Sequence, residues 1–205
     1  MKRGMDFCLA LLALLVLTPL ILVVGFAVRL TSPGPVIYWS ERVGRRNVLF
    51  SMPKFRTMYL NTPQLATHLL EGAEKHITPL GNLLRKTSLD ELPQLWSVLV
   101  GHMSLVGPRP ALFNQDDLVA LRTQKGVQRL RPGITGWAQV NGRDELKLHE
   151  KVEYDVEYMQ KISTEFDLKV LLLTMAKVLR RDGIQQAKIS SHSNDSASEP
   201  QKRAA

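Results

Sequence analysis

Residues 7–28 read FCLALLALLVLTPLILVVGFAV, a run of 22 residues that contains no charged side chain. A straight helix of this length would extend about 33 Å, close to the thickness of the hydrocarbon core of a bilayer. A cleaved signal peptide is the first alternative, because Lys2 and Arg3 precede the run. However, the run is longer than the apolar region of a usual signal peptide, and no A-x-A cleavage site follows it. We therefore expect residues 1–30 to form a membrane helix.

The dipeptide Thr18-Pro19 lies near the middle of this run. Proline removes a helical hydrogen bond and bends the helix, while the Thr18 hydroxyl can satisfy a freed backbone group. Short basic flanks tend to stay in the cytoplasm, and here both flanks are basic. They contain Lys2 and Arg3 on one side, and Arg29, Arg42, Arg45, Arg46, Lys54 and Arg56 on the other. These features predict a re-entrant helix, broken at its middle, that enters one leaflet and returns. A kinked transmembrane anchor fits the same residues equally well.

The composition of the whole chain limits its organisation. It has 205 residues, with 27 Lys+Arg against 19 Asp+Glu and a formal net charge of +8. A domain typically has roughly 100–200 residues, so we expect residues 31–184 to form one domain. The single cysteine, Cys8, excludes a disulfide framework and a Cys/His zinc cluster. Residues 185–205 are rich in Ser, Ala and charge without periodicity, which predicts a disordered tail.

Apolar periodicity and turn residues predict an α+β fold that is mostly helical. The expected elements are a β-hairpin of residues 36–39 and 48–50, helices at 62–86 (with a break at 78–81), 90–100 and 116–125, a rigid loop at 107–110, and Gly-rich loops at 131–133 and 136–142.

Two apolar stripes at helical spacing follow in the last third of the chain. Tyr154, Tyr158 and Ile162 form the first, which is typical of core packing. The second stripe consists of Leu168, Leu172, Met175 and Leu179. Because basic residues flank it, this helix would either pack in the core or lie as an amphipathic helix at the membrane interface.

The adjacent carboxylates Asp90 and Glu91 lie in the sequence SLDELPQL, where two helix starts compete. Ser88 and Glu91 fit a capping box, but Pro93 would then fall where its missing N–H is needed. With Asp90 as the N-cap, Pro93 falls at the third helical position, where the amide has no helical partner. We therefore expect Asp90 and Glu91 to lie together at a helix start.

Paired carboxylates beside cations suit phosphate chemistry. Mg²⁺ prefers one or two carboxylates together with substrate phosphate oxygens, and a carboxylate can also attack phosphorus to form an acyl phosphate. The chain has no G-x-x-x-x-G-K-[ST] loop, no G-x-G-x-x-G and no D-x-D, so arginines would bind the phosphates instead. Candidates are Arg85 beside the pair and Arg109, Arg131 and Arg143 in Pro- or Gly-rich loops.

The basic segment 42–56, with Lys54 and Arg56, is either a solvated face or a surface for anionic lipid or a phosphorylated ligand.

These motifs together resemble the bacterial sugar transferase family, the monotopic phosphoglycosyl transferases. The matching runs are KFRTM at 54–58, SLDELPQL at 88–95, MSLVGPRP at 103–110, RPGITGWAQVNGR at 131–143, YDV at 154–156 and DLK at 167–169. The resemblance covers roughly residues 1–183, and Thr18-Pro19 stands where minimal members of the family have Ser-Pro.

The resemblance implies a reaction in two steps. Asp90 would attack the β-phosphate of a UDP-sugar, release UMP and hold the phospho-sugar covalently, and undecaprenyl phosphate would then take it. Glu91 would assist by binding Mg²⁺ or by activating the acceptor phosphate. Arg85 and Arg109 match phosphate-holding positions, and Arg143 lies in the nucleotide-side loop. The short form favours an N-acetylated amino sugar as donor.

The resemblance also implies a location, the cytoplasmic face of the bacterial inner membrane, and a role at the first membrane step of glycoconjugate synthesis. It leaves open the sugar, the pathway and whether the chain forms a homodimer. Three other functions remain as alternatives: a non-enzymatic adaptor for anionic lipid, a nucleic-acid binder suggested only by the net charge, and a glycosyltransferase that would release UDP. The basic balance fits phosphate substrates and an anionic leaflet better than nucleic acid.

Overall fold

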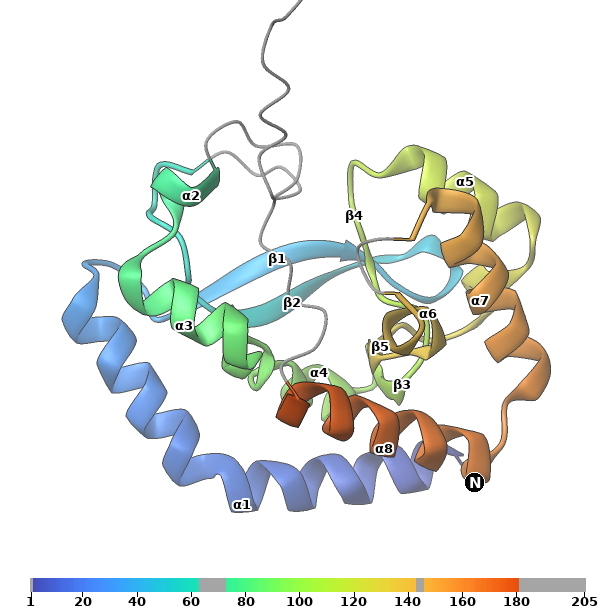
Figure 1. Ribbon diagram of the computed structural model, residues 1–205, viewed down its shortest axis with the longest axis horizontal. Helices are drawn as coiled ribbons and strands as arrows, with labels where there is room; N and C mark the ends of the chain where they lie inside the picture. Colours follow the sequence, from blue (N-terminus) through green and yellow to red (C-terminus); the bar gives the residue numbers. More distant parts are fainter. Residues whose placement is uncertain (1, 63–72, 143–145, 181–205) are drawn as a thin grey trace, which may run out of the picture.

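A computed structural model describes residues 2–62, 73–142 and 146–180 of the chain (Figure 1). The fold is mixed α/β and mostly helical, as the sequence predicts. Its helices are α1 Lys2–Thr31, α2 Ala73–His76, α3 Pro79–Thr87, α4 Gln94–Val100, α5 Asp116–Gln124, α6 Trp137–Val140, α7 Leu148–Lys161 and α8 Thr164–Arg180. Its strands are β1 Ile37–Val43, β2 Leu49–Phe55, β3 Ser104–Val106, β4 Ala111–Leu112 and β5 Gly133–Thr135. The expected tail at 185–205 lies outside the described residues.

Helix α1 is long and apolar enough to cross a membrane by length and composition. Only 11% of its most apolar 18-residue window is buried, so it is not the core helix of a soluble protein. It bends near its middle (Figure 1), where Pro19 lies inside the helix, but it is not broken there. The Thr18 hydroxyl donates to the carbonyl of Leu14 at 2.7 Å. This carbonyl is not the one that Pro19 frees, so the bond helps to bend the helix and does not repair the lost one.

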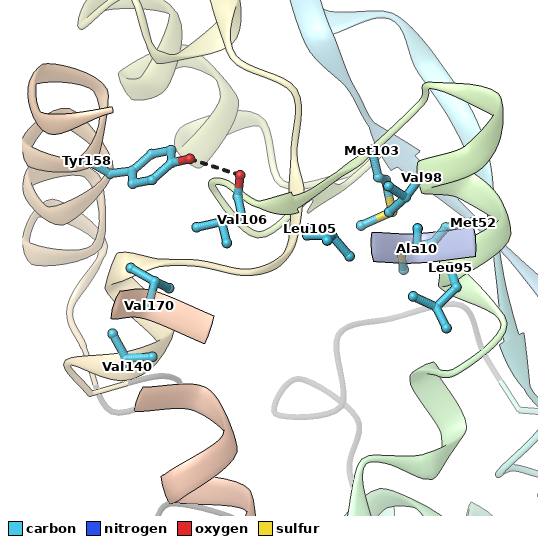
Figure 2. Close-up of a cluster of buried hydrophobic side chains, with 10 residues drawn as sticks. All are labelled: Ala10, Met52, Leu95, Val98, Met103, Leu105, Val106, Val140, Tyr158 and Val170. Atoms are coloured by element: carbon cyan, nitrogen blue, oxygen red, sulfur yellow. Dashed lines mark hydrogen bonds between the residues drawn. The ribbon is translucent and has the colours of Figure 1, made fainter. Parts of the chain in front are cut away.

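Both halves of α1 pack against the rest of the chain. In the first half, Ala10 is fully buried among Val98, Met103 and other core residues, as Figure 2 shows. In the second half, Val24 and Val28 belong to a separate apolar cluster with Phe55 and Leu84. The two ends of the helix are therefore held by one body.

Polar contacts fix the N-terminal end of α1 to distant elements. Lys2 pairs with Asp167 of α8, which is fully buried, and the Asp6 carboxylate accepts from the Ser104 hydroxyl at 2.8 Å. Arg3 donates to two carbonyls at the end of α4. Buried charges need such partners, so these contacts define where the N-terminal end of the helix lies.

The β1–β2 hairpin confirms the strands expected at 36–39 and 48–50 and extends both of them. It is antiparallel, with Tyr38 opposite Lys54 and Ser40 opposite Met52, and β4 adds to its other edge. A second, parallel pair joins β3 to β5. Side chains alternate along a strand, so Lys54 lies on the same face of the sheet as the buried Ser40 and Met52.

Two local predictions were wrong. Asp90 does not begin the helix, because a short 3-10 turn covers Leu89–Glu91 and α4 starts only at Gln94 after Pro93. Pro93 has no N–H, and Ser88 adopts a left-handed conformation (φ 57°), so α3 ends and the chain turns before α4 begins. The Gly-rich segments also contain strand β5 and helix α6, which the loop prediction missed.

The remaining predicted helices and the 107–110 loop are confirmed where the structure describes them. The break lies at residues 77–78 and not over 78–81, because α3 already begins at Pro79 with Thr78 as its N-cap, while residues 63–72 lie outside the described chain. Tyr158 of the first stripe is buried in the core and donates to the Val106 carbonyl (Figure 2). In the second stripe Leu168, Leu172 and Met175 are 53–61% exposed, so α8 does not bury it in the core.

Replacing Met103 by alanine should lower the free energy of unfolding by about 2–5 kcal/mol, because it opens a cavity in a fully buried position. Met175→Ala is the matched control, since Met175 is 61% exposed, and its change should stay within about 0.5 kcal/mol. Denaturant unfolding in detergent measures both values. Equal losses in the two variants would contradict the assignment of the core.

Candidate active site

The turn Leu89–Glu91 is held by an apolar cluster to which the second half of α1, α3 and β2 all contribute. Leu89 and Leu92, on either side of the carboxylate pair, pack on the apolar cluster that contains Val24 and Val28. Asp90 itself is 8% exposed. The apolar neighbours thus connect the two adjacent carboxylates to a cluster that includes residues of the apolar helix α1.

Glu91 binds two cations from separate parts of the chain. Its Oε1 atom accepts from Lys54 Nζ at 3.0 Å and from Arg109 Nη2 at 2.8 Å. Burial opposes ionisation of Glu91, but Arg109 and Lys54 outweigh it and hold the pKa of Glu91 well below its usual range. Glu91 is therefore ionised at neutral pH and joins β2 to the 107–110 loop.

Asp90 has the opposite electrostatic balance. Burial raises its pKa, the Glu91 charge raises it further, and Lys54, Arg85 and Arg109 only partly oppose the shift. No hydrogen bond reaches its carboxylate from the residues that the structure describes. Arg85 is fixed nearby, since its Nε donates to the Thr57 hydroxyl at 2.9 Å. The folded protein therefore disfavours the charge of Asp90, in contrast to that of Glu91.

Arg42 is a fourth cation of the site that the sequence analysis did not single out. Its Nη1 donates to the Pro110 carbonyl at 3.3 Å and its Nε to the Ser40 hydroxyl at 2.9 Å. Burial, together with the Arg109 charge, lowers the pKa of Arg42 to about 10, so it stays charged at neutral pH. Strand alternation could have indicated it, because Arg42, Ser40 and Lys54 share one face of the hairpin.

The structure divides the predicted phosphate ligands into two groups. Lys54, Arg85 and Arg109 gather around the carboxylates. Arg56 lies elsewhere, where its Nη2 donates to the Ser32 carbonyl just after α1. Arg131 donates to the Gly101 carbonyl at the end of α4. Arg143, the remaining candidate, lies outside the described residues.

The charges of the site suit phosphate groups. Four cations, Arg42, Lys54, Arg85 and Arg109, surround two carboxylates, which leaves an excess of positive charge. In the described part of the chain no three Asp, Glu, His or Cys side chains converge as a metal cage. Two carboxylates fit Mg²⁺ only when substrate phosphates complete its shell, which is the usual arrangement for this ion.

The two carboxylates should respond in opposite ways when each is neutralised. At pH 7, Glu91→Gln should lower the free energy of unfolding by about 1–3 kcal/mol, because Lys54 and Arg109 lose their counter-charge. Asp90→Asn should raise it by about 0.5–2 kcal/mol, because folding raises the Asp90 pKa and so disfavours its ionised form.

Glu153→Gln is the control for this pair, since Glu153 is an exposed carboxylate on α7. Its change should stay within about 0.5 kcal/mol. Denaturant unfolding of the four proteins in one detergent gives the comparison. Destabilisation by Asp90→Asn would show that the folded state favours the Asp90 charge.

Comparison with known proteins gives the same assignment over nearly the whole described chain. The profile of the family described as bacterial sugar transferase matches residues 1–181. An uncharacterized sugar transferase of Bacillus subtilis, EpsL, is 43% identical over 188 residues, which are 91% of each chain. The UDP-glucose:undecaprenyl-phosphate glucose-1-phosphate transferase of Escherichia coli K12 is 40% identical over 185 residues. The UDP-N-acetylgalactosamine-undecaprenyl-phosphate N-acetylgalactosaminephosphotransferase of Aeromonas hydrophila is 36% identical over 183 residues.

The matches differ in how much of each relative they cover. The alignment takes in 86% of this chain but only 40% of the E. coli protein, and 87% of this chain but 43% of the Aeromonas protein. The chain therefore corresponds to one part of these longer relatives and to nearly all of EpsL. The family match, over residues 1–181, includes the segments that hold the carboxylates and their cations. The chain belongs to the bacterial sugar transferase family.

Proposed function

We propose that this protein transfers a sugar-1-phosphate from a UDP-sugar to undecaprenyl phosphate. The observation that carries the proposal is the Asp90-Glu91 pair, which lies among four cations and next to an apolar cluster that includes residues of the membrane-type helix α1. The names of the E. coli and Aeromonas relatives describe the same class of reaction. The product would be the first membrane-linked intermediate of a bacterial glycoconjugate.

Asp90 is the proposed nucleophile. One oxygen of its carboxylate attacks the β-phosphorus of the UDP-sugar, the bond from that phosphorus to the bridging oxygen breaks, and UMP leaves with the electron pair. The phospho-sugar is then held as an acyl phosphate on Asp90. A phosphate oxygen of undecaprenyl phosphate attacks the same phosphorus, and the Asp90 carboxylate is released.

The cations provide the electrostatic stabilisation that both steps need. Phosphoryl transfer depends mainly on positioning and on charge stabilisation, and Lys54, Arg85 and Arg109 are the cations nearest the carboxylates. Glu91 keeps Lys54 and Arg109 in place. Asp90 and Glu91 would hold a Mg²⁺ together with the donor phosphates, and the ion would offset their negative charge. Glu91 alternatively activates the acceptor phosphate.

The donor we propose is an N-acetylated amino sugar, as in the name of the Aeromonas relative. The E. coli relative is named for glucose, so a panel of UDP-sugars is required to identify the donor. No described residue assigns the sugar.

The proposed location is the cytoplasmic face of the bacterial inner membrane, with α1 as a re-entrant helix. Contacts at both ends of α1 support this topology. Lys2 and Asp6 at one end of α1 bind Asp167 and Ser104, while the chain just after its other end is bound by Arg56. A helix that crossed the bilayer would separate these two ends by the membrane. The exposed stripe on α8 supports an interfacial position for that helix.

Purified protein incubated with UDP-sugars, Mg²⁺ and undecaprenyl phosphate should release UMP. Without the acceptor, a donor labelled in its β-phosphate should label the protein covalently. Asp90→Asn should abolish both signals, because the nucleophile is lost. EDTA should stop transfer and added Mg²⁺ should restore it.

Arg45→Gln serves as the matched control in this assay, because Arg45 is an exposed cation that contacts the Arg129 carbonyl. It should transfer like the wild type. Release of UDP in place of UMP would exclude the phosphoglycosyl reaction and favour a glycosyltransferase. Binding of the protein to anionic vesicles without any transfer, unchanged by Asp90→Asn, would favour a lipid adaptor.

The topology can be tested by cysteine labelling in a Cys8→Ser background. Gly4→Cys places a thiol before the apolar run, where the added side chain meets no neighbour within 4 Å, and Glu41→Cys places one on β1. A membrane-impermeant maleimide should label neither site in intact cells and both sites in inverted vesicles. Labelling of Gly4→Cys alone in intact cells would establish a spanning helix.

A further inference from the structure

A buried ion pair between α5 and α7 lies behind the 107–110 loop. Arg122 is 8% exposed and Asp155 is 2% exposed. The Asp155 Oδ2 atom accepts from Arg122 Nε at 2.9 Å and from Nη2 at 2.6 Å. Neither residue touches the carboxylates of the site, and the proposed reaction does not use them. Burying such a pair costs desolvation energy, so its presence suggests a role other than stability.

The third nitrogen of the Arg122 guanidinium, Nη1, contacts the backbone of the 107–110 loop. It donates to the carbonyl oxygen of Arg109 at 2.8 Å. The next carbonyl, that of Pro110, accepts from Arg42 at 3.3 Å. Two guanidinium groups from different elements therefore hold two successive carbonyls of this loop.

These contacts act on the second half of the loop, because the backbone hydrogen bonds to β5, from Gly107 N–H to Thr135 and from Gly133 N–H to Pro108, hold only its first half. Pro108 and Pro110 have no N–H, and their rings restrict the backbone on both sides of Arg109. A backbone held at its carbonyl fixes the direction in which the Arg109 side chain leaves the loop. From this position the Arg109 Nη2 reaches Glu91 Oε1 at 2.8 Å. The ion pair is thus connected to the site through one residue.

We propose that Arg122, oriented by Asp155, is a positioning residue that holds the Arg109 backbone so that its guanidinium reaches Glu91. The effect on turnover rests on the proposed function, whereas the effect on the loop does not. Asp155 fixes the fork of Arg122 by two bonds, and this leaves Nη1 in one direction. Lysine in place of Arg122 keeps the charge beside Asp155 but cannot make the same three bonds.

The first part of the test does not depend on enzymatic turnover. Hydrogen–deuterium exchange should be faster by about tenfold in Arg122→Lys than in the wild type at two amides that tie the loop to β5: Gly107, which donates to Thr135, and Gly133, which donates to Pro108. Arg122→Gln/Asp155→Asn replaces the pair by neutral groups of similar shape and should give the same result. Arg45→Lys is the control, because Arg45 makes a similar contact to the Arg129 carbonyl at 2.8 Å, and it should leave these amides unchanged.

The second part is a double-mutant cycle on turnover. Arg122→Lys should lower kcat by about 10- to 100-fold with little change in KM, since a misplaced transition-state contact affects kcat. Arg109→Gln should lower kcat by at least as much. If Arg122 acts through Arg109, the double variant should have the kcat of Arg109→Gln alone.

Two results would overturn the proposal. Losses of kcat that multiply in the double variant would show that Arg122 acts independently of Arg109. Unchanged exchange of the Gly107 and Gly133 amides in both Arg122 variants would show that the pair does not hold the loop. Failure of the proposed function is a separate result, because it appears as missing UMP release in the wild-type protein, while the exchange data still test the positioning of the loop.

Discussion

The structure depends on the cations that balance the negative charges of two adjacent carboxylates, which lie in a turn with little exposure to solvent. Asp90 is 8% exposed, and Leu89 and Leu92 beside the pair pack on an apolar cluster of α1, α3 and β2. Buried charges require partners, and here the partners come from β1, β2, α3 and the 107–110 loop. The fold can be understood as the arrangement that brings these four segments to one turn.

The candidate site and helix α1 are connected by apolar packing. Leu89 and Leu92 of the turn pack on the apolar cluster that includes the second half of α1. Ala10, in the first half, packs in the core with residues of α4 and β2. The bend at Pro19 allows both halves to contact the same body (Figure 1). A reaction between a soluble donor and a lipid phosphate needs its nucleophile at the bilayer surface, and this packing would hold Asp90 at such a depth.

Within the site, the two carboxylates differ electrostatically because their surroundings differ. Glu91 accepts from two cations and is stabilised as an anion, whereas burial raises the pKa of Asp90 and no described side chain donates to it. Such a difference between neighbouring acids is a common sign of separate roles in catalysis. The Arg122–Asp155 pair contacts this site indirectly. Arg122 donates to the backbone carbonyl of Arg109, and the Arg109 side chain donates to Glu91.

The sequence by itself determined the elements whose signals are local. The apolar run, the hairpin, the helix at 116–124 and the rigid 107–110 loop follow from composition, alternation and proline. The family motifs also indicated Asp90, Glu91, Lys54, Arg85 and Arg109. Only the tertiary structure decided which cations meet the carboxylates: Arg42 joins them, while Arg56 and Arg131 bind backbone carbonyls elsewhere. The physical reason is that the residues next to a charged side chain in the sequence do not indicate its partner. The partner depends on how distant segments pack together.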